Sequence, residues 1–98
     1  MLWRHGDVLI ASIDTIPSEA KRHTGTILVY GEATGHAHRI EDPATVEVWK
    51  LHNELFLNVI DVARIIHEEH QPITLPLGTY RVWQQREYTP KAIIPIKD

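Results

Sequence analysis

Short apolar runs, each closed by a turn-forming residue, recur along the first half of the chain. Residues 7–13 hold a run rich in β-branched side chains, which ends before Pro17. Residues 26–30 hold a second run, closed by Gly31, and residues 36–40 follow as a third short segment. Runs of this length and composition, bounded by Gly and Pro, favour β-strands. We therefore expect a first strand and a loop, and then a hairpin or a bulged strand pair.

Two later stretches alternate apolar and polar side chains, as a half-buried strand requires. Residues 46–51 do so roughly, after the turn signal Asp42-Pro43. Residues 80–88 alternate more clearly. Tyr80 and Val82 would lie on one face of the strand, and Arg81, Trp83 and Gln85 on the other. Both stretches are predicted to be strands.

The stretch from residue 54 to residue 70 is harder to assign. Its polar residues recur every three or four positions, as on an amphipathic helix that Asn53 would cap. Its apolar residues, such as Val59, Ile60 and Val62, are β-branched and poor helix formers. Two strands that turn at residues 58–61 fit this composition better. We favour two strands, and one helix is the alternative.

The length and the turn spacing predict one small all-β domain. A chain of 98 residues suffices for one hydrophobic core and is too short for two, so residues 1–98 are predicted to form a single domain. About six to seven short strands with turn signals at near-regular spacing suggest a small antiparallel sandwich or barrel. An apolar tail at about residues 89–98 would need cover, along a sheet edge or against a neighbouring subunit.

Composition narrows the class of protein. With 43% hydrophobic and 23% charged residues, the chain is ordinary for a globular protein. Its net charge is −3 and its basic residues are scattered, which argues against nucleic-acid binding. The N-terminal residues lack the pattern of a signal peptide, and no apolar stretch is long enough to span a membrane. We expect a cytoplasmic protein with no membrane partner.

Histidine is the main anomaly, with seven copies beside one Phe and one Met. On a strand, His36 and His38 would lie on the same face, close enough to share a metal ion. His67 and His70 lie further along and enclose Glu68 and Glu69, so a ligand set of three or four imidazoles with a carboxylate is available. The chain has no cysteine, so its ligands would be nitrogen and oxygen. The pattern predicts a divalent ion such as Zn, Ni, Fe or Mn.

The role of such an ion would depend on its coordination. With one position open, a bound water would be acidified or a substrate oxygen polarised, and Glu68 or Glu69 would move protons. With four protein ligands, the ion would be structural. The spacing in His67-Glu68-Glu69-His70 differs from the zinc-protease motif, whose histidines are four apart. The alternative is that the histidines are solvated or pair with carboxylates across strands.

Other candidates for chemistry are fewer. Arg86 could clamp a carboxylate or a phosphate, and Tyr88 could transfer a proton, although such a strand is more often a solvated face. Trp3, Trp49 and Trp83 fill the core or anchor a subunit interface, and core filling is the favoured interpretation. The chain has no cysteine nucleophile and no Gly-rich phosphate loop.

Two resemblances add expectations. The H-x-H segment, a downstream histidine and the turn Pro76-Leu77-Gly78 are similar to the pattern of cupins, which implies a β-barrel with one metal held by histidines and a carboxylate. The chain is short for that barrel, and Glu41 has the wrong strand parity for the carboxylate. Four further patches resemble a family of small bacterial proteins of unassigned function, which implies a β-rich fold and no catalytic residues; they are residues 31–39, 67–70, 75–80 and 85–90.

Three functions compete. The first is a metal-binding β-domain with His36, His38, His67 and His70 as ligands. The second is a non-enzymatic subunit that forms a homo-oligomer or docks on a protein partner. The third is a nucleic-acid module that would need its arginines and aromatic residues on one face.

Overall fold

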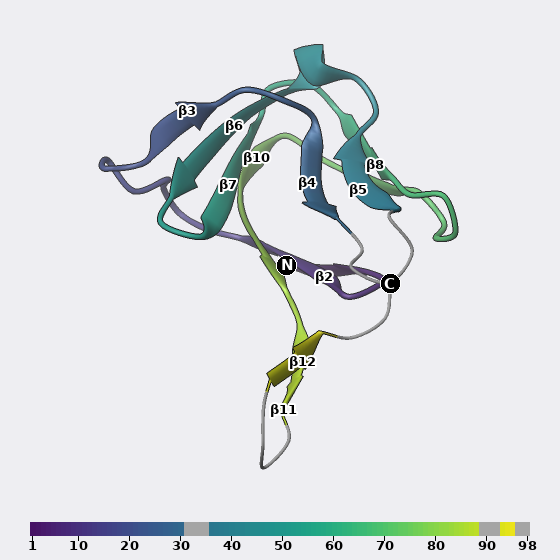
Figure 1. The fold of residues 1–98 in the computed structure, drawn as a ribbon. Helices are drawn as coiled ribbons and strands as arrows, with labels where there is room; N and C mark the ends of the chain where they lie inside the picture. The colour runs from purple at the N-terminus through teal and green to yellow at the C-terminus, as the bar shows by residue number, and fades with distance from the viewer. Residues whose placement is uncertain (31–35, 89–92, 96–98) are drawn as a thin grey trace.

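The computed structural model describes residues 1–30, 36–88 and 93–95, and it shows an all-β architecture in them (Figure 1). These residues form no α-helix, and a single 3-10 turn, η1, lies at Pro43–Thr45. The first six strands are β1 (Leu2–His5), β2 (Val8–Ser12), β3 (Lys21–His23), β4 (Ile27–Tyr30), β5 (Ala37–Ile40) and β6 (Val46–Leu51). The others are β7 (Glu54–Val59), β8 (Ala63–Ile66), β9 (Ile73–Leu75), β10 (Gly78–Gln84), β11 (Arg86–Tyr88) and β12 (Ile93–Pro95).

The strands form two larger antiparallel sheets and one hairpin. The six-stranded sheet has the order β1-β2-β10-β7-β6-β3, and the four-stranded sheet has the order β4-β5-β8-β9. Strands β11 and β12 pair only with each other, and Figure 1 shows this hairpin projecting from the rest. The prediction of a small antiparallel all-β fold is confirmed. The described residues hold twelve strands rather than six or seven, because several three- and four-residue strands, such as β1 and β3, are too short to give a pattern.

Both larger sheets contribute to one hydrophobic core, as in a sandwich. Side chains from every strand between β2 and β10 except β3 take part in it. Strand β7 lies inside the six-stranded sheet between β10 and β6, and its Leu57 is fully buried. In the other sheet Ile65 and Leu75 are also fully buried. Alternation along the strands therefore directs one face of each sheet to a shared interior.

The stretch 54–70 is two strands, as favoured from its composition. Strand β7 pairs with β6 and β10, whereas β8 pairs with β5 and β9, so the two strands belong to different sheets. Residues 60–62 carry the chain from one sheet to the other. The polar residues that gave the helical period lie on exposed or partly exposed positions of these strands and their turn.

A tight turn joins β1 to β2 and determines where two polar residues, His5 and Asp7, lie. His5 pairs with Val8, which leaves Gly6 and Asp7 as the two-residue loop. Gly6 has a φ of 64°, and Asp7 is not among the residues of positive φ. A positive φ at the first loop residue alone is the pattern of a type II′ turn, which favours Gly there.

Part of the predicted C-terminal tail is described. Residues 93–95 form β12, whereas residues 89–92 and 96–98 lie outside the described residues. That residues 1–98 form one domain stays a prediction. The part of the chain that the structure describes has no helix long and apolar enough to cross a membrane.

Truncating the centre of the core tests the fold. Leu57→Ala should lower the free energy of unfolding by about 2–5 kcal/mol, because it leaves a cavity where Leu57 is fully buried. The control is Leu77→Ala, which makes the same change at a side chain that is 61% exposed. It should change the free energy of unfolding by less than about 0.5 kcal/mol. Urea denaturation followed by circular dichroism measures both. Equal losses in the two variants would contradict this core.

Candidate metal centre

Three histidines meet at the junction of the two larger sheets. His38 lies in β5, His67 directly follows β8, and His70 lies in the loop before β9. One ring nitrogen of each lies within 4.8 Å of those of the other two. The register that pairs Arg39 with Ile66 brings His38 beside His67, with ring centroids 4.3 Å apart. His38 and His67 are buried, and His70 is partly buried.

The ring of His70 is held against the turn between β1 and β2. Its Nε2 atom is buried and has no hydrogen-bond partner. A Cβ atom added to Gly6 would lie 2.5 Å from this nitrogen, so the close approach depends on glycine as well as on the positive φ. A buried nitrogen without a hydrogen-bond partner is costly, and a metal ion would satisfy it. The donor set therefore fits a metal ion.

His36, the fourth predicted ligand, lies at the margin of this group. Its Nδ1 atom is 3.3 Å from Oε1 of Glu69, and its ring centroid is 5.5 Å from that of His67. It immediately precedes β5, so its predicted place on the strand face of His38 stays a prediction. The structure thus brings together His38, His67 and His70, and it places His36 beside them and next to Glu69.

The two glutamates between the histidines have other partners. Glu68 forms an ion pair with Arg39 through both carboxylate oxygens, at 2.8 and 2.9 Å, and accepts a hydrogen bond from the amide of Ala37. That amide, followed by Arg39, lowers the pKa of Glu68 to about 2. A carboxylate of this pKa is a weak base near neutral pH. Glu69 is exposed and faces His36.

The side chains of Arg86 and Tyr88 lie outside the described residues, although their backbone forms β11. Their predicted roles stay predictions. The nucleic-acid alternative would use Arg39 and Arg81 as well as Arg86, and the first two are engaged within the chain: Arg39 pairs with Glu68, and Arg81 pairs with Glu54. Arg81 also stacks on Trp83, at 4.6 Å from the ring centroid.

Of the three tryptophans, Trp3 packs against the core and meets Tyr80 edge to face. Of the two interpretations from the sequence, core filling therefore applies to Trp3. Trp49 lies under the guanidinium of Arg22, so it and Trp83 have polar neighbours instead.

Two buried polar residues were not predicted from the sequence. His5 and Asp7 are only 2% and 1% exposed, and both contact the ring of His38. Nδ1 of His5 is 3.0 Å from Nδ1 of His38, and Oδ1 of Asp7 is 3.1 Å from Nε2 of His38. The available signal was the triplet His5-Gly6-Asp7 ahead of a β-branched run, since Gly-Asp between two strands forms a hairpin loop.

Burial keeps these imidazoles in the neutral form. It is the largest cause that lowers the pKa of His38 to about 4, with smaller contributions from His67 and His5, while Asp7 opposes the shift. Burial also lowers the pKa of His5, against a hydrogen bond to the carbonyl of Gln71. Neutral imidazole is the form that binds a metal ion, so the histidines are in the ligating state at neutral pH.

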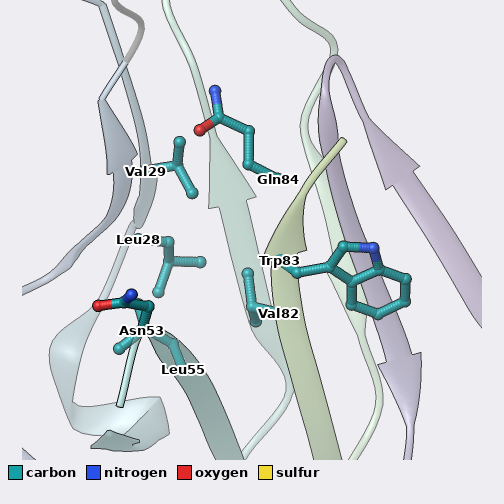
Figure 2. A pocket seen from close by; sticks show the side chains of 7 residues that line it. All are labelled: Leu28, Val29, Asn53, Leu55, Val82, Trp83 and Gln84. Atoms are coloured by element: carbon teal, nitrogen blue, oxygen red, sulfur yellow. The ribbon is translucent and has the colours of Figure 1, made fainter. Parts of the chain in front are cut away.

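A pocket of about 490 Å³ adjoins this network through Gln84. Two polar residues, Asn53 and Gln84, line it together with Leu28, Val29, Leu55, Val82 and Trp83 (Figure 2). Figure 2 shows the ring of Trp83 turned away from Leu28 and Leu55. Nε2 of Gln84 donates a hydrogen bond to Oδ2 of Asp7, so one wall of the pocket contacts the carboxylate beside His38.

The lowered pKa of His38 predicts acid sensitivity of the metal-free protein. The imidazole titrates near 6.5 in the unfolded chain and at about 4 in the folded one, so the unfolded state binds protons first as the pH falls. Stability present above pH 6.5 should be lost progressively toward pH 4, by about 3 kcal/mol for this group. Urea denaturation of chelator-treated protein measures the loss. His23→Gln, on edge strand β3, should keep the same slope, and a flat profile from pH 6.5 to 5 would contradict the assignment.

Comparison with known proteins gives one match. A family model described as a domain of unknown function (DUF8820) matches residues 4–85. The chain matches no curated protein and no solved structure. The matched range includes His5, Asp7 and all the candidate ligands, and it ends at residue 85, where the patch at residues 85–90 begins. The expected membership of an uncharacterised family is confirmed, its bacterial origin stays a prediction, and the chain belongs to the DUF8820 family.

Proposed function

We propose that this protein binds one divalent transition-metal ion through His38, His67 and His70. The observation that supports the proposal is that ring nitrogens of His38 in β5 and of His67 and His70 in the β8–β9 loop converge within 4.8 Å at a largely buried place. Among these atoms, Nε2 of His70 is buried without a hydrogen-bond partner, which is costly unless something satisfies it. A bound cation does so.

The donor set limits the choice of ion. Imidazole nitrogen suits Zn, Ni and Fe, whereas Mn favours oxygen ligands. Zinc is the first choice, because it accepts four-coordinate sites built from nitrogen donors. Ni and Fe remain in the proposal, and Mn is the least favoured of the four ions.

A catalytic role would need a coordination position that water can reach. A bound water would then be acidified, and a nearby base would take its proton. Glu68 is held as a carboxylate by Ala37 and Arg39, so the exposed Glu69 is the better candidate of the two for that base. Arg86 and Tyr88 stay in the proposal as groups that bind or protonate a substrate.

Zinc titration tests the proposal. The wild-type protein should bind about one zinc ion, which should raise its melting temperature by 10 °C or more, since ligand at about 1,000-fold over Kd adds about 4 kcal/mol. His67→Gln should weaken zinc affinity by at least about 100-fold, because it removes a ligand. Isothermal titration calorimetry with a competing chelator measures affinity, and elemental analysis measures stoichiometry.

The matched control is His23→Gln on edge strand β3, outside the histidine group. This variant should bind zinc as the wild-type protein does. Wild-type protein that neither contains nor takes up Zn, Ni or Fe would refute metal binding. Equal losses in His23→Gln and His67→Gln would refute the site.

Self-association is a second candidate role, supported by an apolar patch. Ile60, Val62 and Leu77 are each at least half exposed. They lie in neighbouring loops, because Val59 pairs with Gly78 and Ala63 with Leu75. An apolar patch of this kind is typical of an interface.

Light scattering tests this second role. The wild-type protein should show at least twice the monomer mass of 11.3 kDa at micromolar concentration, and Val62→Asp with Leu77→Asp should return it to the monomer. Zinc binding should be unchanged in that variant. A wild-type protein that is monomeric throughout the micromolar range would refute self-association and leave the metal proposal intact.

A further inference from the structure

His5 and His38 face each other through the same atom of each ring. Their Nδ1 atoms lie 3.0 Å apart, although β1 and β5 belong to different sheets. Two nitrogens at this distance need something positive between them, either a proton or a metal ion. The other nitrogen of each ring shows which state the two facing atoms are in.

The Nε2 atom of each ring has an oxygen partner. Nε2 of His5 is 2.9 Å from the backbone carbonyl of Gln71, which can only accept a hydrogen bond, so this Nε2 carries the proton. Nε2 of His38 is 3.1 Å from Oδ1 of Asp7, and an ionised carboxylate also only accepts. The other oxygen of Asp7 accepts from Gln84, which holds the carboxylate in place.

With both protons on Nε2, two Nδ1 lone pairs point at each other. Metal-ligating histidines nearly always donate their other ring N–H to a carboxylate or a backbone carbonyl. His38 has the first partner and His5 has the second. Both rings therefore donate Nε2–H as metal-ligating histidines do, and both have the Nδ1 lone pair available for a metal ion.

We propose that His5 is a fourth ligand, which closes the shell of the ion at four imidazoles with His38, His67 and His70. The proposal rests on the proposed metal binding and extends it. Ligand nitrogens at about 2.0–2.1 Å from a tetrahedral ion lie roughly 3.4 Å from each other. Binding would thus move the rings of His5 and His38 apart by a few tenths of an ångström from the present 3.0 Å. It would also bring the ring of His5, whose centroid lies 6.2 Å from that of His67 and 5.7 Å from that of His70, closer to the other two ligands.

The closed shell assigns the ion a structural role. His5 comes from the six-stranded sheet, and His38 and His67 come from the four-stranded sheet and its end. One ion would therefore cross-link the two sheets and fasten the β1–β2 hairpin. Gly6 supports this arrangement, because it lets the ring of His70 approach the turn that carries His5. Asp7 and Gln84 are positioning residues that act through His38.

X-ray absorption at the zinc edge tests the proposal on the wild-type protein itself. The expected result is four nitrogen neighbours at about 2.0 Å with the scattering pattern of four imidazoles. Three imidazoles and a water oxygen would overturn the fourth ligand while leaving the proposed metal binding intact. Failure of the wild-type protein to bind any zinc would overturn both.

Paired variants add a second readout. His5→Gln should replace one imidazole by an oxygen ligand and weaken zinc affinity by at least about 100-fold. His36→Gln, the matched change at the margin of the group, should keep four imidazoles and an affinity within about threefold of the wild type. Equal affinities in the two variants would overturn the role of His5. If His5→Gln fails to fold, the wild-type absorption spectrum still decides.

Discussion

The structure depends on how it buries polar side chains at the junction of its two larger sheets. His5, Asp7, His38 and His67 are all buried there, at a place where a small sandwich would normally hold apolar residues. A buried polar group without a partner costs about 1–3 kcal/mol, and a domain of this size is stable by only about 5–15 kcal/mol. The hydrogen bonds of this cluster are therefore a condition for the fold, and an ion that completes them would contribute a large fraction of its stability.

The same cluster explains why the β1–β2 turn has its sequence. Asp7 accepts from Gln84 and faces His38, while His5 reaches the carbonyl of Gln71. Gly6 lies between them, where a side chain would displace His70. Three consecutive residues thus contribute a ring, a space and a carboxylate to one site. A hairpin at the edge of the larger sheet is in this way connected to the smaller sheet by polar contacts, in addition to the shared apolar core.

Sequence patterns predicted the strands better than they predicted the site. Alternation and β-branched runs located most of the strands, and composition correctly resolved residues 54–70 into β7 and β8. His67 and His70 lie with His38 as expected, whereas His36 is not part of that group. The contribution of His5 depends on the contact between a hairpin of one sheet and a strand of the other. No local pattern reports such a contact, because it is fixed only when the two sheets pack.

For an ion bound as proposed, the surrounding residues favour a structural role over a catalytic one. A catalytic metal needs an open position and a base whose pKa suits proton transfer. Glu68 is one of the two residues that the sequence offers as this base. Its carboxylate is bound by Ala37 and Arg39, which lower its pKa to about 2. In the proposed site, Nδ1 of His5, which lies 3.0 Å from Nδ1 of His38, would occupy the position that a water would need. The pocket beside Gln84 reaches only Asp7, a residue that orients His38 from behind. A ligand in that pocket would therefore act on a bound ion only indirectly, through the hydrogen bond that the ring of His38 donates to Asp7.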